Sequence, residues 1–430
     1  RQFGFARESS CADGHLYFQR QVSHYAAKLG PKQPFRVLVL SLDVRKAFDS
    51  APFASILKAL IGRGCPLWLA RLIHNWLVGR SQRVRVGDAL SKPIKVPSGT
   101  PQGATLSPQL YACLVLDSFS LPYHEDTELI HFADDALLFR PFLSALDEDR
   151  LMEDAERYVA YLADLGLSVN PGKSKVMVLS LSSSPARLSK PFEIRGESVL
   201  ETLELRYLGI VVDRRLSFSS HWAQLCARAK TALAAIGHLI GWEPVALKHL
   251  VQERVLSLLA FSLLPCPPST GYAWERLDGL LGYCAHRITN VWSRHGAELL
   301  QEAELPSAAH LYASLAMPFA FSCACRRRRF GEFIGRGSHP LLQPPRRTGL
   351  RSQSLQPSNP AVAPLLFDPP PHNRFAKLDG LGSKLLIEQW NRLVLHSADS
   401  IENTFTSLEK FKCHVKVISS DLWPSTKAFK

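Results

Sequence analysis

Two adjacent acidic residues stand between two short apolar runs. Asp134 and Asp135 lie after Leu129–His131 and before Ala136–Phe139, so we expect them at the tip of a β-hairpin. Neighbouring carboxylates repel each other, and the pair is costly to keep ionised unless a cation neutralises it. Taken alone, an Asp-Asp pair is more often an ordinary turn, because Asp is a favoured turn residue.

A third acid, Asp43, ends a largely apolar predicted strand that begins at Arg36. A charge there is costly to leave without a partner, although Asp43 could instead cap the helix that follows it. If this strand and the hairpin are neighbours, three carboxylates converge on one edge of a sheet. That arrangement suits two Mg²⁺ ions, or Mn²⁺ in their place, roughly 3.5–4 Å apart. Such ions activate an attacking 3′-OH and stabilise a leaving pyrophosphate.

The segments that must position these acids alternate between β-rich and helical patterns from Phe35 to about Val212. We expect strands at residues 36–42, 82–86 and 175–181, a hairpin at 129–139, and further hairpin strands over 192–200 and 203–212. We expect helices at residues 51–62, 106–117 and 151–165, the last capped by Gly166. Strands that carry helices on one face indicate an α+β sheet of the split βαβ type.

The rest of the chain has a different character. Residues 214–338 are helix-rich and predict a separate helical domain. Residues 339–372 are rich in Pro, Ser and Arg, which is typical of an extended linker. Residues 373–430 form a C-terminal segment to which we assign no role, with one expected helix near 384–395.

Composition limits the class of protein. Hydrophobic residues make up 46% of the 430, enough for a substantial core, and the formal net charge of +13 favours a polyanionic partner, nucleic acid first. The sequence contains no secretion signal and no apolar run of the ~18–20 residues that a membrane helix needs. Nine scattered cysteines favour reduced thiols over a disulfide framework. We therefore expect an intracellular protein, in the nucleus and the cytoplasm, without a membrane partner.

Three short motifs follow one another along the chain: Asp43–Asp49, Ser98–Pro108 and Phe132–Asp135. They resemble the A, B and C motifs of reverse transcriptases. Their residues are most similar to those of the non-LTR (LINE-type) retrotransposon enzymes. Gly166–Ser174 and Arg206–Ile210 resemble the next two motifs of the family. Any one block would be a weak match, but five in order make a specific one. The resemblance implies the right-hand fold of the family, with a split βαβ palm over residues 35–213 and a helical thumb and connection over 214–338.

The resemblance also implies catalytic roles. Asp43, Asp134 and Asp135 match the metal-binding aspartates, and Lys173 matches a lysine that protonates the leaving pyrophosphate or orients the triphosphate. Phe48 matches the bulky residue that closes the sugar pocket, where a ring would clash with a ribose 2′-OH and so select deoxynucleotides. The plainer alternatives are a core Phe on a helix and a surface Lys near a turn.

Two further sets of residues are implied to touch the substrates. Gln102 and Gly103 match the loop along the nascent base pair, where Gly permits close backbone approach and Gln can donate and accept hydrogen bonds. A Pro-Gln-Gly turn of no function is the alternative. Tyr207, Leu208 and Gly209 resemble the hairpin that grips the primer end. The helical thumb after it would hold the duplex by shape and phosphate contacts.

The sequence departs from the family at its start. Gln2–Arg7 resembles the last motif of the fingers, but Ala6 stands where the family usually has Arg. Either Arg7 takes over triphosphate binding or that binding is weakened. The fingers segments that normally precede this motif are missing, as is an upstream endonuclease. We therefore expect residues 1–34 to be a remnant of the fingers in an N-terminally truncated chain.

Basic residues interleave with an aromatic one around the strand expected at 82–86. Arg80, Arg83 and Arg85 flank it, and Trp76 precedes it. This pattern suits contact with a nucleic-acid template. Apolar stems packed on the protein with solvated charged heads would give the same pattern.

Together these features predict a fragment of a LINE-type RNA-directed DNA polymerase. Its partners would be an RNA template, a DNA primer and deoxynucleoside triphosphates. A maturase or telomerase-like reverse transcriptase is a less favoured hypothesis, because the residues after Asp43 and around Asp134 resemble those of LINE-type enzymes. The alternative from another class is an inactive retroelement remnant that at most binds nucleic acid. The intact acids speak against loss of activity by mutation, whereas the missing fingers speak for loss by truncation.

Overall fold

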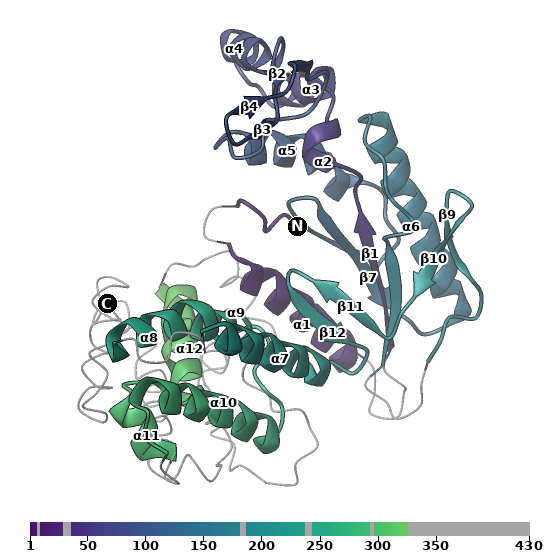
Figure 1. Ribbon diagram of the computed structural model, residues 1–430. Helices are drawn as coiled ribbons and strands as arrows, with labels where there is room; N and C mark the ends of the chain where they lie inside the picture. Colours follow the sequence, from purple (N-terminus) through teal and green to yellow (C-terminus); the bar gives the residue numbers. More distant parts are fainter. Residues whose placement is uncertain (7–8, 29–35, 181–185, 237–242, 293–295, 326–430) are drawn as a thin grey trace. The chain divides into compact units, whose positions relative to one another are not determined.

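A computed structural model describes residues 1–6, 9–28, 36–180, 186–236, 243–292 and 296–325. The chain forms two compact units, coloured along the sequence in Figure 1. The first comprises Arg1–Gly14 and Tyr25–Leu216, and the second comprises His15–His24 and the chain from Ser217 onward. This division falls close to the palm boundary expected at 213, and the full domain scheme stays a prediction. The expectations for Arg7 and for residues 339–430 lie outside the described residues.

A six-stranded sheet forms the centre of the first unit, in the order β6-β7-β1-β8-β10-β9 (Figure 1). Its strands are β1 (Arg36–Asp43), β6 (Glu128–Phe132), β7 (Asp135–Pro141), β8 (Lys175–Ser180), β9 (Phe192–Ile194) and β10 (Glu197–Glu201). β7 runs antiparallel to both β1 and β6, and β8 runs antiparallel to β1. Helix α5 (Ser107–Val115) precedes β6, and α6 (Ala145–Asp164) joins β7 to β8. The split βαβ arrangement is thereby confirmed.

Strand β1 is buried on both faces, which its nearly continuous apolar run allows. Because side chains alternate along a strand, Leu38, Leu40 and Leu42 share one face, and Asp43 shares the other face with Val37 and Val39. The Leu face belongs to a core cluster that includes Tyr111 and Leu114 of α5 and Leu151, Tyr158 and Leu162 of α6. Asp43 therefore stands on the sheet face opposite α5 and α6.

Helix α6 follows the predicted apolar stripe and begins earlier than predicted, at Ala145. Gly166 has a φ of +80°, which only Gly adopts readily, as its predicted role after the helix requires. A Cβ at Gly166 would also lie 2.6 Å from Cγ of Pro52. The end of α6 is therefore closely packed against the segment that leads into α3 (Phe53–Gly62).

Two parts of the chain before Ser217 differ from expectation. Helix α1 (Cys11–Lys28) was not predicted within the segment expected to be a remnant. The strand expected at 82–86 is wrong, because two small hairpins replace it. In these hairpins β2 (Ser81–Gln82) pairs with β5 (Ile94–Lys95), and β3 (Arg85–Val86) pairs with β4 (Ala89–Leu90). Val84 and Val86 are 65% and 74% exposed, so their alternation does not mark a buried face.

The remaining elements of the first unit are short. They are α2 (Ala47–Ser50), α4 (Leu67–Leu77), the 3₁₀-helix η1 (Leu116–Ser120), β11 (Glu204–Tyr207) and β12 (Ile210–Asp213). β9 and β10 form one antiparallel hairpin, and β11 and β12 form another, in agreement with the hairpin strands expected over 192–200 and 203–212. The chain reverses direction within each of those ranges, at Arg195–Gly196 and at Leu208–Gly209, where φ is positive.

The described part of the second unit beyond Ser217 is helical, as predicted. Its elements are α7 (Ser219–Ile236), α8 (Pro244–Val251), the π-helical turn η3 (Gln252–Leu256), α9 (Ser257–Leu263), α10 (Gly271–Thr289), α11 (Gly296–Glu302) and α12 (Ala308–Cys325). Buried polar groups hold its core, with His221 Nε2 2.9 Å from Ser262 Oγ and Trp222 Nε1 donating to the Cys266 carbonyl at 3.0 Å. Among the helices of the described ranges, none combines the length and the apolar character needed to cross a bilayer.

Candidate active site

The register of the sheet places two of the three candidate acids opposite each other, with the third next to them in the chain. Asp43, at the end of β1, is paired directly with Asp135, at the start of β7. Opposite residues of antiparallel strands have their Cα atoms about 4.5–5.5 Å apart, with their side chains on the same face. Asp134 immediately precedes Asp135 in the two-residue turn that follows Phe132. The two chain segments therefore meet as the two-metal prediction requires, and the role of each residue stays a prediction.

Crowding of these acids changes their protonation. Partial desolvation, together with the Asp134 and Asp43 carboxylates, raises the pKa of Asp135 to about 6. Desolvation and the Asp43 carboxylate also raise the pKa of Asp134, against the effect of a backbone hydrogen bond. Like charges that raise each other's pKa are stabilised in their ionised form by a nearby cation. The electrostatics of the site thus fit a divalent ion.

The donor set also fits such ions. Mg²⁺ takes oxygen ligands and is usually bound through one or two protein carboxylates together with substrate phosphates and water. Within the described ranges, no three His, Cys, Asp or Glu side chains are grouped so that they could hold a metal ion by themselves. Asp43 and Asp135, paired across the sheet, supply oxygen donors of the kind that Mg²⁺ takes one or two at a time.

The turn that carries Lys173 is fastened to the backbone of Asp43. Asn170 N donates to the Asp43 carbonyl at 2.8 Å, and Asp43 N donates to Ser174 Oγ at 3.3 Å. Ser174 Oγ in turn donates to the Asn170 carbonyl at 2.9 Å. Lys173 is exposed on this turn. Sequence reasoning missed Ser174, and only its place beside Lys173 in the motif could have pointed to it.

The loop expected along the nascent base pair is bound to the segment after β1. Thr100 N donates to the Phe48 carbonyl at 2.8 Å, and Gln102 Nε2 donates to Asp49 Oδ1 at 3.0 Å. Gly99 has a φ of +83°, and a Cβ there would lie 2.5 Å from the Asp49 carbonyl oxygen. Gly103 has a φ of +84° and is exposed. Asp49, which sequence reasoning did not single out, therefore orients the amide of Gln102.

Phe48 packs against an aromatic residue, Tyr111, that interacts with Asp134. Its ring is half-buried, with its centroid 4.8 Å from that of Tyr111 in α5. Burial, and secondarily the Asp134 carboxylate, raise the pKa of Tyr111 above its usual value, so the two side chains interact. The sugar-pocket role of Phe48 stays a prediction.

The three candidate template arginines lie in different surroundings. Arg80 is directed inward, because its guanidinium donates to the carbonyls of Leu77 and Gly99 and lies 5.7 Å from the Phe53 ring centroid. Desolvation lowers the pKa of Arg80 accordingly. Arg83 and Arg85 are exposed. Arg80 thus holds the Gly99 loop, whereas the other two arginines remain accessible.

The expected primer-grip residues lie at the tip of the β11–β12 hairpin. Tyr207 and Leu208 are buried, and Gly209, with a φ of +82°, is exposed. Burial, followed by the Asp135 carboxylate, raises the pKa of Tyr207 far above its usual value. The tip therefore lies close enough to the acids to interact with them. Of these three residues, Gly209 is the accessible one.

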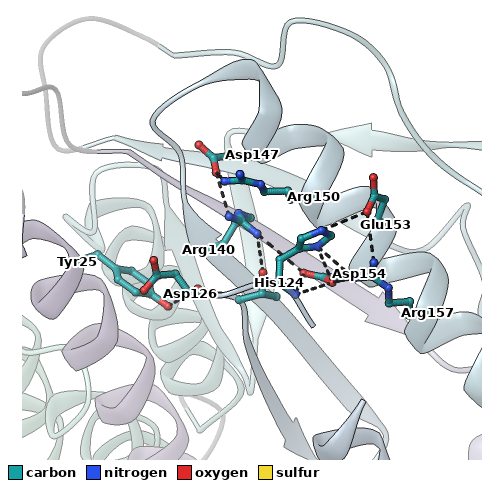
Figure 2. Close-up of polar contacts among 10 residues, drawn as sticks. Tyr25, His124, Asp126, Arg140, Asp147, Arg150, Glu153, Asp154 and Arg157 are labelled. Carbon is teal, nitrogen blue, oxygen red and sulfur yellow. Dashed lines mark hydrogen bonds and ion pairs between the residues drawn. The ribbon is translucent and has the colours of Figure 1, made fainter. Parts of the chain in front are cut away.

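The opposite end of the β6–β7 hairpin is anchored to α6 by buried charges (Figure 2). Arg140 of β7 donates to Asp147 Oδ1 at 3.0 Å and to Thr127 Oγ1 at 2.9 Å, and it lies 4.0 Å from Asp154. Its side chain is only 3% exposed. Burial raises the pKa of Asp147, but the Leu143 and Ser144 N–H groups and Arg140 outweigh that effect and lower it overall.

Asp154, which is completely buried, extends this network. It accepts hydrogen bonds from the backbone and ring of His124 and from Arg157 at 2.6 Å, as drawn in Figure 2. On the same sheet face as Asp43, Phe139 contacts the ring of Tyr25 in α1. The hairpin that presents the acids is thus fixed at its base by ion pairs and ring contacts far from the turn.

Because His131 of the same hairpin is buried, we expect the fold to lose stability in acid. His131 lies between the rings of Phe119 and Tyr158, and burial lowers its pKa to about 3. The unfolded chain, with a His pKa of about 6.5, binds the extra proton throughout the window between these values, so stability falls as the pH falls through it. We expect urea denaturation to show a loss of about 2–3 kcal/mol between pH 7.5 and 4.5 from this group.

The His131→Phe variant isolates that contribution. The comparison is needed because Asp135, whose pKa is raised, binds its proton more readily in the folded state and opposes the trend. The variant should have a flatter dependence of unfolding free energy on pH than the parent chain. Equal slopes for the two proteins would contradict a neutral, buried His131.

Comparison with known proteins agrees with this geometry. Residues 1–212 match the sequence profile of the reverse transcriptase (RNA-dependent DNA polymerase) family. This part of the chain is a reverse transcriptase domain, which is the class that the sheet and its acids define. The curated relatives are non-LTR retrotransposon proteins, and the chain is similar in sequence to them.

The probable RNA-directed DNA polymerase from transposon X-element of Drosophila melanogaster is 29% identical over 237 residues, covering 54% of this chain and 25% of that protein. A Pol polyprotein of the R2 retrotransposable element from Nasonia vitripennis is 32% identical over 184 residues, covering 40% and 18%. This chain thus spans a quarter or less of the length of these relatives. The apo telomerase structure from Candida tropicalis shares 12% identity and a TM-score of 0.38 over 72% of this chain and 51% of that one, too distant a likeness to support an inference.

Proposed function

We propose that this chain is part of a LINE-type RNA-directed DNA polymerase, which adds deoxynucleotides to a primer 3′-OH on an RNA template. The observation that carries the proposal is the pairing of Asp43 with Asp135, with Asp134 next to it in the turn. Membership of residues 1–212 in the reverse transcriptase family supports it. We also infer that the protein acts in the nucleus and the cytoplasm, where such templates and primers are found.

Asp43, Asp134 and Asp135 would hold two divalent ions, Mg²⁺ or Mn²⁺. When bound, these ions supply activation of the 3′-OH and stabilisation of the leaving pyrophosphate. The protein's own groups bind and orient the substrates. Lys173, exposed on the turn fastened to Asp43, would give a proton to the leaving pyrophosphate or orient the triphosphate. Gln102, oriented by Asp49, would contact the nascent base pair.

Nucleic acid would be bound by exposed residues of α4 and of the segment that follows it up to β5. Arg83 and Arg85 are accessible to template phosphates, and Trp68 of α4, 69% exposed, offers a face for base stacking. The net charge of +13 supports a polyanionic partner. Arg80 would act indirectly by holding the Gly99 loop, and Gly209 would offer its main chain to the primer end.

The proposal is tested by incorporation of deoxythymidylate on poly(rA)/oligo(dT) with Mg²⁺. Product that lengthens with time supports the enzyme. Retained RNA binding without any product, at saturating protein and nucleotide, would contradict polymerase activity and favour the inactive remnant. A parallel reaction on poly(dA)/oligo(dT) measures the preference for an RNA template.

Phe48→Val should weaken discrimination against ribonucleotides. Removal of the ring opens space beside the sugar, so a 2′-OH that clashed with it is tolerated. A steric difference of this size is worth roughly 10–200-fold. The measurement is the ratio of kcat/KM for dTTP and UTP, with Phe53→Val, a change to another partly buried Phe of the same core, as the matched control. An unchanged ratio in Phe48→Val would remove Phe48 from the sugar pocket.

A further inference from the structure

The first residues of the chain lie against the hairpin that carries the acids. Gln2 pairs in parallel with His131 of β6. Phe3 N donates to the His131 carbonyl, and His131 N donates to the Arg1 carbonyl, both at 2.8 Å. The segment therefore joins the open side of β6 through an isolated β-bridge. The backbone of this segment lies beside the turn that contains Asp134.

The turn itself has an unfavourable backbone. Ala133, the first of its two residues, has a φ of +59°. A two-residue hairpin loop with positive φ at this position strongly prefers Gly, because a Cβ crowds the backbone there. Such strain at a site persists only when the surrounding structure holds it. Ala133 is also buried, so its N–H needs a partner within the protein.

The side chain of Gln2 supplies that partner. Its Oε1 accepts hydrogen bonds from Ala133 N at 3.1 Å and from Gly4 N at 3.0 Å. Both groups that face this oxygen are donors, so the position requires an acceptor. Gly4 allows the close approach, because a Cβ at Gly4 would lie 2.2 Å from Ala133 N and 2.8 Å from the Phe132 carbonyl carbon.

We propose that Gln2 is a positioning residue for the turn that presents Asp134 and Asp135, with Gly4 as the contact that admits it. The proposal rests on the proposed function, because it assigns Gln2 a task in that same site. Gln2 does not touch the substrates in this role. It fixes the backbone of Ala133, and through it the direction in which the next two carboxylates leave the turn.

Gln2→Met tests the proposal in the full 430-residue chain, because Met keeps the length of the side chain and removes the acceptor. We expect hydrogen exchange at the Ala133 amide to quicken about tenfold, the effect of one lost hydrogen bond. Mn²⁺ affinity, measured by electron paramagnetic resonance, should fall by a similar factor. In primer extension kcat should fall about tenfold while the KM for dTTP changes little.

Two further variants separate positioning from general stability. Gln2→Asn, which retracts the carbonyl, should reproduce the effects of Gln2→Met and replaces it if that variant does not fold. Ala133→Gly in the Gln2→Met background should restore part of the Mn²⁺ affinity and of kcat, because Gly adopts the positive φ without support. Gln224→Met on the exposed face of α7 is the matched control and should change none of these quantities.

Unchanged Ala133 exchange and Mn²⁺ affinity in both Gln2 variants would overturn the proposal. So would a loss of kcat without rescue by Ala133→Gly, because that pattern indicates only a destabilised fold. If the parent chain makes no product, the polymerase proposal fails, and the exchange and Mn²⁺ measurements still decide the role of Gln2.

Discussion

Asp134→Asn is expected to reduce primer extension on poly(rA)/oligo(dT) by about 10³-fold or more, with the fold intact. The amide removes one of the negative charges that neutralise the divalent ions, and such ions supply several kcal/mol of transition-state stabilisation. Because this carboxylate is crowded by Asp43, replacing it also relieves a repulsion in the metal-free protein. Thermal stability should therefore be unchanged or slightly higher while activity is lost.

The same measurement distinguishes a shared site from three independent acids. Asp43→Asn should be as damaging as Asp134→Asn, and the double variant should be little worse than either, because residues that act as a unit are not additive. Asp164→Asn, at the exposed end of α6, is the matched control and should retain full activity. Equal product from Asp134→Asn and the parent chain would remove the catalytic assignment.

Arg140→Met is expected to be the most destabilising substitution in the first unit. It removes the buried guanidinium partner of Asp147, leaving only the half-exposed Arg150 at 3.4 Å, and it takes a nearby positive charge from the fully buried Asp154. Breaking a buried ion pair by removing one partner costs about 3–5 kcal/mol. For a unit of this size that corresponds to a fall of roughly 6–20 °C in the midpoint of its calorimetric transition.

Lys190→Met is the comparison variant. Lys190 forms an exposed ion pair with Asp149 of α6, the helix that also carries Asp147. Exposed pairs contribute little to stability because water screens them, so the transition should move by no more than a few degrees. The further change Asp147→Asn in the Arg140→Met background should recover part of the loss, because the amide is cheaper to bury than an unpaired carboxylate. Equal shifts for Arg140→Met and Lys190→Met would contradict the anchoring role of the buried network.

Local patterns were sufficient to predict the strands that carry the acids, but not that these strands are neighbours. The apolar run before Asp43 and the hairpin around Asp134 are strands because their residues are β-branched or aliphatic and their boundaries are sharp. Once both acids end or begin a strand, only the neighbour relation of those strands is needed. The structure supplies that relation through the β1–β7 register.

Features that depend on contacts distant in sequence were not predictable in the same way. The alternation of Val84 and Val86 is the same for a buried strand and for an exposed hairpin, so only tertiary structure distinguishes them. Arg80 looks like its neighbours Arg83 and Arg85 in sequence, but it is directed toward the Gly99 carbonyl. The support that Gln2 gives to Ala133 joins segments that no local rule connects.

The pairing of Asp43 with Asp135 as a binding site for divalent ions is tested most directly by anomalous diffraction at the manganese edge. The crystals would contain the chain, a primer–template, a deoxynucleoside triphosphate and Mn²⁺. We predict anomalous density within coordination distance of the carboxylates of Asp43 and at least one of Asp134 and Asp135, shared with the triphosphate. Manganese bound to the triphosphate alone, with the Asp43 side chain on the face covered by α5 and α6, would contradict the account.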